Sequence, residues 1–122
     1  MLKQFMKSTK GFTLVELMVV VVILGILTSI AIPVYNQTQE NAREKACFAN
    51  QRIMEGAAQQ HVANEGSLPT TTVNGDAIYD DYLSEYLKDM PVCPGTSSEE
   101  GVYSLEPDGT VRCSVHDYYG GE

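Results

Sequence analysis

The hydrophobic positions along the chain fall into two contrasting parts. From Phe12 to Val34 nearly every residue is apolar, and Glu16 is the only charge in this run of 23 residues. A continuous helix of this length would be roughly 35 Å long, which is enough to cross the roughly 30 Å hydrocarbon core of a bilayer. The pattern therefore predicts a membrane-spanning helix that carries one carboxylate.

After this run the pattern becomes amphipathic. Small and apolar residues recur at three- and four-residue spacing, which is typical of one face of a helix. This stripe comprises Ala42, Ala46, Ala49, Ile53 and Ala57. The opposite face carries Glu40, Arg43, Glu44, Gln51, Glu55 and Gln59. Gly66 and Pro69 then supply a stop signal. We predict one long helix from about Phe12 to about Glu65, whose second half packs by its apolar face.

The last part of the chain predicts a small mixed head. Residues 67–76 read as a loop, and the apolar and tyrosine positions between 79 and 90 have the spacing of a short helix. Two short alternating runs flank Pro107-Asp108-Gly109, which indicates a β-hairpin. The predicted fold class is α+β: a long N-terminal helix, membrane-spanning in its first half, packed on a small C-terminal head with a short antiparallel β-sheet.

Charge divides the chain in the same way. Residues 1–11 hold three lysines and no acid, whereas residues 35–122 hold five basic and fifteen acidic residues, a net charge of −10. Such an acidic head argues against direct, non-specific binding of nucleic acid. The basic leader predicts a cytoplasmic N-terminus by the positive-inside rule. No nucleophile elbow, zinc-protease motif, P-loop or dinucleotide fingerprint occurs, so nothing in the sequence indicates an enzyme.

Two ordinary interpretations of residues 1–34 leave features unexplained. Ser29-Ile30-Ala31 resembles the cleavage site of a secretory signal peptide, but the apolar run is longer than the usual hydrophobic region of such a peptide. A plain membrane anchor accounts for the length of the run but not for Glu16, because a charge inside a membrane is costly and usually functional.

The stretch KGFTLVELMVVVVILGILTSIAIP, residues 10–33, resembles the N-terminal segment of type IV prepilins and type II secretion pseudopilins. It combines a basic leader, a Gly11-Phe12 junction, a glutamate four residues past that phenylalanine, an apolar run, and a late Gly25 and Pro33. The resemblance implies that a membrane-embedded prepilin peptidase cuts after Gly11 and N-methylates Phe12. Glycine suits that role, because a residue without a side chain lets an extended backbone enter a membrane-embedded site.

The same resemblance implies a structural subunit of a type IV pilus-like filament or a type II secretion pseudopilus. The subunit would be a single-pass inner-membrane protein with an exported head before assembly, and part of a cell-surface or periplasmic filament afterwards. Its partners would be the peptidase, copies of itself and other pilin-like subunits, and an inner-membrane assembly platform with its ATPase. The alternative from another class is a membrane-tethered binding module that never polymerises.

Glu16 has two candidate roles. By resemblance, its carboxylate pairs with the terminal amine of a neighbouring subunit, so that each charge offsets the desolvation of the other. The intrachain alternative is an interaction with the positive end of its own helix. Gly25 and Pro33 mark a weak segment of the helix, where we expect a kink near residues 29–33.

The resulting organisation has four segments. They are a leader peptide at 1–11, a transmembrane and filament-core helix at 12–34, the amphipathic second half of the helix at 35–66, and a small disulfide-stapled head at 67–122. In the head, Cys93-Pro94-Gly95, Tyr103 and Cys113-Ser114 resemble a recurrent head type of small pilin-like proteins. That resemblance implies a Cys93–Cys113 disulfide, which leaves Cys47 unpaired or as an alternative partner.

Metal sites are the less favoured interpretation of the head. Cys47, Cys93, Cys113 and His116 add up to a Cys₃His zinc set. There is no CxxC knuckle, however, and an exported domain favours disulfides. Asp76, Asp80 and Asp81 invite a calcium interpretation, but they follow no EF-hand pattern and are expected in a solvated loop. We therefore predict no metal and no cofactor, and we interpret His61 as a surface residue of the helix.

Overall fold

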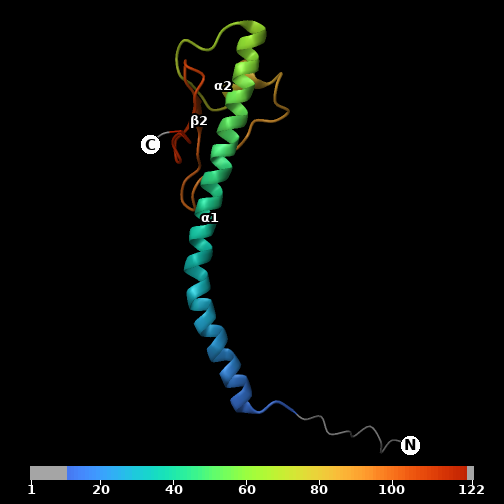
Figure 1. Ribbon diagram of the computed structural model, residues 1–122, viewed down its shortest axis with the longest axis vertical. Coiled ribbons are helices and arrows are strands. Elements are labelled where there is room, and N and C mark those ends of the chain that lie inside the picture. Colours follow the sequence, from blue (N-terminus) through green and yellow to red (C-terminus); the bar gives the residue numbers. More distant parts are fainter. Residues whose placement is uncertain (1–10, 121–122) are drawn as a thin grey trace, which may run out of the picture. The chain divides into compact units, whose positions relative to one another are not determined.

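The computed structural model describes residues 11–120 (Figure 1). Most of the predicted leader, residues 1–10, lies outside the described residues, as do residues 121 and 122. The chain separates into two compact units, one that ends at Gln37 and one that begins at Thr38. The predicted segment boundaries at residues 34 and 66 stay predictions.

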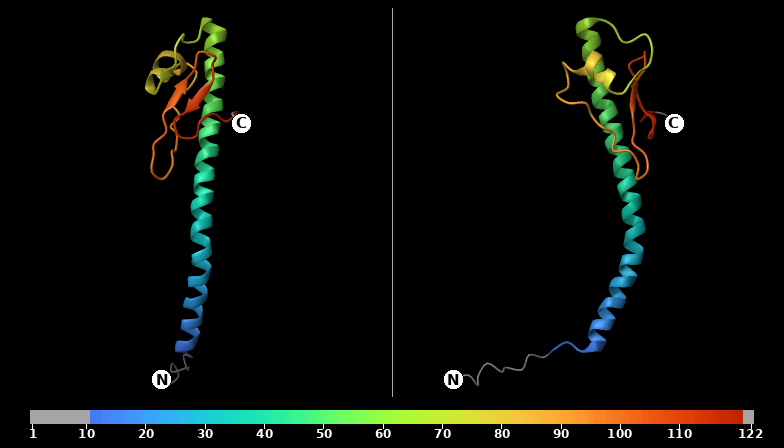
Figure 2. Two further views of the ribbon diagram at one scale, coloured as in Figure 1. Left: turned by 90° about the vertical axis from the view of Figure 1, so that its left-hand side faces the viewer. Right: turned by 180° about the vertical axis from the view of Figure 1, so that it is seen from behind.

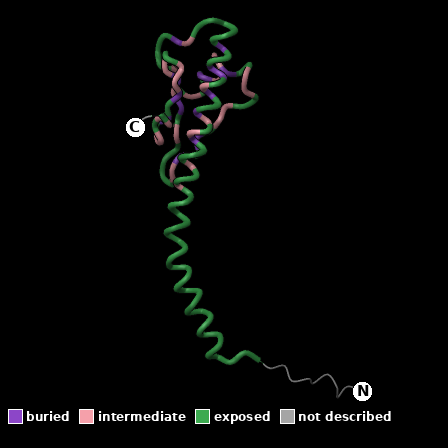
Figure 3. The backbone as a smooth tube through the Cα atoms, in the orientation of Figure 1, coloured by how far each residue is buried: buried purple, intermediate pink, exposed green. Residues whose placement is uncertain are grey.

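The long helix α1 spans Leu14–Glu65, as predicted. Its last turn is closed by the N–H of Gly66, which donates to the carbonyl of Val62 at 2.8 Å. Every described side chain from Gly11 to Gln39 is exposed (Figure 3). An apolar surface of this size would aggregate in water, so the first half of α1 needs lipid or other protein around it.

Two hydroxyl groups in this apolar half are satisfied by the helix itself. Thr28 Oγ1 donates to the carbonyl of Leu24 at 2.6 Å, and Ser29 Oγ donates to the carbonyl of Ile26 at 2.7 Å. Such bonds remove the cost of placing a hydroxyl in a medium without water. α1 continues past Pro33 without interruption. The kink and the weakening of the helix at Gly25 and Pro33 stay predictions.

The sheet of the head has three short antiparallel strands in the order β1-β2-β3, of which Figure 2 shows the orange hairpin pair beside the helix. They are β1 (Val73–Asn74), β2 (Tyr103–Leu105) and β3 (Val111–Cys113). The predicted hairpin is confirmed as β2 and β3, which pair with Tyr103 opposite Cys113 and Leu105 opposite Val111. β1 corrects the prediction of a loop at 67–76, because Val73 pairs with Leu105 along the free edge of β2.

A short helical stretch precedes the hairpin, as expected. It consists of α2 (Asp76–Ile78) and a π-helical turn, η1 (Tyr79–Leu83). This stretch ends at Leu83, well before residue 90. The following loop is held by Tyr79, whose Oη donates to the carbonyls of Leu87 and Lys88 at 3.1 and 2.7 Å. Asp76, Asp80 and Asp81 are exposed, but they lie in this helical stretch rather than in a loop.

The core of the head lies between α1, the sheet and the short helix. Its buried side chains come from all three; the fully buried ones include Met54, Ile78, Leu83, Leu105, Val111 and Cys47. His61 is buried as well, which corrects its predicted place on the surface. Its ring meets the rings of Tyr82 and Tyr86 edge-on, with centroids 5.3 and 6.1 Å away.

The face by which α1 packs differs from the predicted one. Of the predicted apolar stripe only Ala57 is buried, whereas Ile53 is 51% exposed. The buried residues of α1 are Cys47, Gln51, Met54, Ala57, Ala58 and His61. The sequence pattern places Gln51 on the polar face, but its side chain is buried with its amide partnered. It donates to the carbonyl of Asp117 at 2.6 Å and accepts from the N–H of Tyr119 at 3.2 Å. A buried amide with both partners costs little.

Candidate functional site

The amino end of α1 is closed by a reciprocal pair of hydrogen bonds. The N–H of Thr13 donates to Glu16 Oε2 at 3.0 Å, and the N–H of Glu16 donates to Thr13 Oγ1 at 3.2 Å. α1 begins at Leu14, so Thr13 is the N-cap and Glu16 is the third helical residue. This arrangement is a capping box, which satisfies two of the backbone N–H groups that a helix leaves free at its start.

Phe12 completes this helix start. Its side chain is 93% exposed, and it lines a shallow apolar hollow together with Glu16, Leu17 and Val20. Phe12 precedes the N-cap and Leu17 is the fourth helical residue, which are the two positions of a hydrophobic staple. The predicted processing junction, Gly11-Phe12, therefore lies immediately before a well-formed helix start. Gly11 itself is exposed, and a side chain there would meet nothing within 4 Å.

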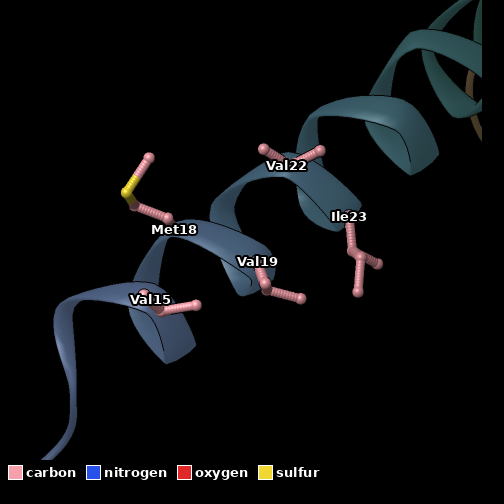
Figure 4. A pocket seen from close by; sticks show the side chains of 5 residues that line it. All are labelled: Val15, Met18, Val19, Val22 and Ile23. Atoms are coloured by element: carbon pink, nitrogen blue, oxygen red, sulfur yellow. The ribbon is translucent and has the colours of Figure 1, made fainter.

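The next two turns present an uninterrupted apolar face (Figure 4). The side chains that line a second hollow are Val15, Met18, Val19, Val22 and Ile23. Their spacing of three and four residues places them on one side of the helix, as packing against another helix requires. α1 is the one helix among the described residues that is long and apolar enough to cross a membrane, with a mean hydropathy of 2.8 over its most apolar 18 residues.

A second constellation lies within the head. We call it the Cys₃His cluster, and it consists of Cys47, Cys93, Cys113 and His116. Cys47 comes from α1, Cys93 from the loop before β2, and Cys113 from the end of β3. One sulfur or nitrogen atom from each of these side chains lies within 4.8 Å of the other three. All three cysteines are buried, and His116 is half-buried.

The sulfurs of the predicted disulfide lie close together without a bond between them, and the Cys93–Cys113 disulfide stays a prediction. Cys93 Sγ and Cys113 Sγ lie 3.4 Å apart, well beyond the roughly 2.05 Å of a disulfide bond, and all three cysteines are free thiols. The resemblance of the head to small pilin-like proteins implied that these two sulfurs would meet. The alternative zinc set of the sequence is brought together as well, with His116 Nδ1 at 3.4 Å from Cys93 Sγ.

Burial and backbone donors act in opposite directions on these thiols. Burial raises the pKa of the Cys47 thiol to about 12, and burial also raises the pKa of Cys93. Burial acts in the same sense on Cys113, but hydrogen bonds from the backbone N–H groups of His116 and Val115 hold its pKa below the ordinary value. Of the three, Cys113 is therefore the sulfur best prepared to carry negative charge.

Sequence reasoning missed the role of Thr13. The signal was present, because a threonine followed three residues later by a glutamate before an apolar run is the pattern of a capping box. Glu16 belongs both to that pattern and to the apolar run, in which it is the only charge. The intrachain alternative for Glu16 thus has a specific form, namely a bond to the N-cap residue rather than a general interaction with the helix end.

Comparison with known proteins adds to this geometry. The family model of the prokaryotic N-terminal methylation motif matches residues 6–32. The type II secretion system core protein G of Klebsiella pneumoniae is 28% identical, over 85% of this chain and 89% of that protein. A fimbrial protein of Pseudomonas aeruginosa is 30% identical, over 88% of this chain and 67% of that protein. No solved structure gives a significant match.

A second core protein G, from Pseudomonas aeruginosa, is 28% identical over 91% of this chain and 92% of that protein. These similarities extend well past the N-terminal motif into the head, so they relate whole chains rather than one segment. They agree with a long apolar helix that begins at the motif and continues into a small α+β head. The chain belongs to the family of type IV pilins and type II secretion pseudopilins, the structural subunits of pili and pseudopili.

Proposed function

We propose that this subunit is cut after Gly11, is methylated on Phe12, and assembles from the inner membrane through the apolar half of α1. The observation that carries the proposal is the complete exposure of that half, in which no described side chain from Gly11 to Gln39 is buried. A surface of this kind anchors the subunit in lipid before assembly. In a filament the same surface packs against copies of itself.

The free energy gained when the apolar helix moves from the membrane into a filament has two sources. Lipid is already apolar, so moving the helix from lipid into a filament gains from close packing and from polar pairing rather than from the hydrophobic effect. Glu16 supplies the polar pairing, because cleavage turns Phe12 into a chain end with a cationic amine. The amine of one subunit and the Glu16 carboxylate of the next offset each other's desolvation. Repeated without closure, this contact produces an open helical filament.

Three kinds of partner follow from this assignment. The prepilin peptidase acts at the Gly11–Phe12 bond and methylates the new terminus. The assembly platform and its ATPase extract the subunit from the inner membrane, and other pilin-like subunits receive it. The head remains on the exported side throughout, which makes the chain a single-pass protein before assembly.

Mass analysis of the mature N-terminus tests the proposal. The chain is recovered from the membrane fraction of its host, and we expect it to begin at N-methylated Phe12. A chain that begins after Ala31 would instead indicate a signal peptide, and an uncut chain from Met1 would indicate a plain anchor. Gly11→Val should leave the leader attached, because a branched side chain obstructs the extended backbone at the cleavage site. Gly25→Ala is the matched control and should be processed normally, since nothing lies within 4 Å of its added methyl group.

A further inference from the structure

The four members of the Cys₃His cluster come from three separate parts of the head. Cys47 projects from α1, Cys93 follows the short helix, and Cys113 and His116 close the hairpin. The described residues contain no other group of three or more histidine, cysteine or acidic side chains whose ligand atoms converge in this way. Local sequence proximity brings together Cys113 and His116 at most, so the fold as a whole creates the convergence.

The distances within the cluster match a tetrahedral metal site. Zinc binds sulfur at about 2.3 Å and imidazole nitrogen at about 2.0 Å, so a tetrahedral site separates its ligand atoms by roughly 3.6–3.8 Å. Here Cys93 Sγ lies 3.4 Å from both Cys113 Sγ and His116 Nδ1, and Cys113 Sγ lies 4.0 Å from His116 Nδ1. The remaining separations are below 4.8 Å. Ligand atoms as far apart as 4.8 Å would have to approach by about 1 Å to form a closed four-ligand site.

Hydrogen-bond donors contact two of the sulfurs. The N–H of Gly95 points at Cys93 Sγ at 3.4 Å, and Gln51 Nε2 donates to Cys47 Sγ at 3.6 Å. Gly95 has a φ of +63°, and a Cβ there would lie 2.1 Å from the carbonyl oxygen of Glu99. The turn after Cys93 therefore requires glycine, and that turn aims an N–H at the sulfur. Hydrogen bonds of this type orient thiolate ligands and stabilise their charge.

Gly101 leaves room for the cluster. A Cβ at this position would lie 2.4 Å from Cys93 Sγ and 2.9 Å from Cys113 Sγ. Any other residue would have to displace both sulfurs. The chain thus keeps a glycine where the two sulfurs approach the backbone just before β2.

We propose that the Cys₃His cluster binds one Zn²⁺ ion as a structural site. The set uses every cysteine of the chain, which resolves the odd cysteine count that a single disulfide leaves. Three thiolates and a neutral imidazole form a closed site with no open position for substrate, as structural zinc sites do. Binding releases the three thiol protons, and the imidazole binds through Nδ1 with its own proton on Nε2. The ion would join α1, the loop before β2, and the hairpin.

Metal analysis of the full-length chain in detergent tests this site. The protein is purified without chelator and without reductant, and zinc is counted by plasma mass spectrometry. We expect one zinc per chain and three cysteines that react with iodoacetamide only after denaturation in EDTA. A sample that lacks zinc is reduced without oxygen and titrated with Co²⁺, for which we expect sulfur-to-cobalt charge-transfer absorption that one equivalent of Zn²⁺ abolishes.

Two outcomes overturn the proposal. One is a Cys93–Cys113 disulfide that only a reductant opens. The other is a reduced chain with three reactive thiols that takes up neither Co²⁺ nor Zn²⁺. His116→Gln should weaken zinc binding more than about 100-fold, because loss of a ligand exceeds the 10–100-fold cost of losing an outer-shell partner. His61→Gln replaces the other histidine of the chain, which lies outside the cluster, and should leave the zinc count unchanged.

Discussion

Glu16 serves its own helix in the single chain and, in our proposal, a neighbour in the filament. Its carboxylate accepts the N–H of Thr13, so it is not an unsatisfied charge even before assembly. One carboxylate oxygen suffices for that bond. The other remains available for the terminal amine of a neighbouring subunit, so the two roles do not exclude each other.

Substitutions at the capping box separate these roles. Glu16→Gln keeps the capping pattern, because glutamine also serves at the third helical position, but it removes the charge. Glu16→Ala removes both, and Thr13→Ala removes the capping hydroxyl while it keeps the charge. We expect both Glu16 variants to lose filament assembly and Thr13→Ala to keep it, at a cost of about 0.5–2 kcal/mol in helix stability.

The readout is the amount of subunit in sheared filaments relative to the membrane fraction. All three variants should still insert in the membrane. Normal assembly of Glu16→Gln would contradict the pairing of charges and leave the capping box as the whole function of Glu16. Absence of the unmodified chain and of all three variants from sheared filaments would favour a tethered module that does not polymerise.

Gly101 permits a second single-residue test, at the Cys₃His cluster. Gly101→Ala places a methyl group 2.4 Å from Cys93 Sγ, and we expect it to lower the free energy of unfolding of the head by about 1–3 kcal/mol, as overpacking does. Gly56→Ala is the matched control, because Gly56 lies in α1 with nothing near its added Cβ. That control should raise stability by up to about 1 kcal/mol through helix propensity. Urea titration followed by circular dichroism measures the free energy of unfolding of both variants. Equal changes in the two variants would contradict the predicted crowding of the Cys93 sulfur in Gly101→Ala.

At the scale of elements, Glu55 holds the hairpin against α1. Its Oε1 accepts the N–H of Val111 in the edge strand β3 at 3.0 Å, and its Oε2 accepts the hydroxyl of Tyr119 at 2.5 Å. The strand edge is thereby covered by the helix instead of being left open to another chain. An acid that the sequence assigns to a solvated helix face thus organises the contact between two elements.

Removing the two halves of this contact should have unequal costs. Glu55→Ala leaves the N–H of Val111 without its acceptor, which costs about 1–3 kcal/mol, whereas Tyr119→Phe loses one hydrogen bond of about 1 kcal/mol. The Glu55 carboxylate also raises the pKa of Tyr119, so this contribution is present below pH 10 and is lost as the pH rises further. Urea titrations should show that the free energy of unfolding falls less from pH 8 to pH 11 for Tyr119→Phe than for the unmodified chain. An equal fall in the free energy of unfolding for both chains would contradict the hydrogen bond between Tyr119 and Glu55.

The sequence predictions that the structure confirms are those that depend on residues close together in the chain. The long helix, its end at Gly66, and the turn at Pro107-Asp108-Gly109 follow from residues close together in the sequence. The buried face of α1 was not predictable in this way. Alanines fit either side of a helix, and Gln51 is buried only because Asp117 and Tyr119, far along the chain, supply its partners. The approach of Cys47 and Cys93 to Cys113 and His116 is equally a product of the whole fold.

At the scale of the whole molecule, the two units are stabilised by different means. The unit that ends at Gln37 has no buried side chain among its described residues, so its environment must come from lipid or from neighbours. The unit that begins at Thr38 has a core, but a thin one built on strands of two and three residues. Small domains of this kind usually need a disulfide or a metal ion in addition to their core.

Thermal unfolding in detergent decides which of these the head uses, by comparing a chelator with a reductant. A zinc ion present at about a thousand times its dissociation constant contributes about 4 kcal/mol, so EDTA should lower the midpoint of head unfolding by at least about 10 °C. One equivalent of Zn²⁺ should restore it, and a metal-free reductant alone should change it little. A Cys93–Cys113 disulfide would reverse this pattern, because its roughly 3 kcal/mol would be lost to the reductant and not to EDTA. His61→Gln should respond to EDTA as the unmodified chain does, whereas His116→Gln should begin near the lower midpoint and respond little.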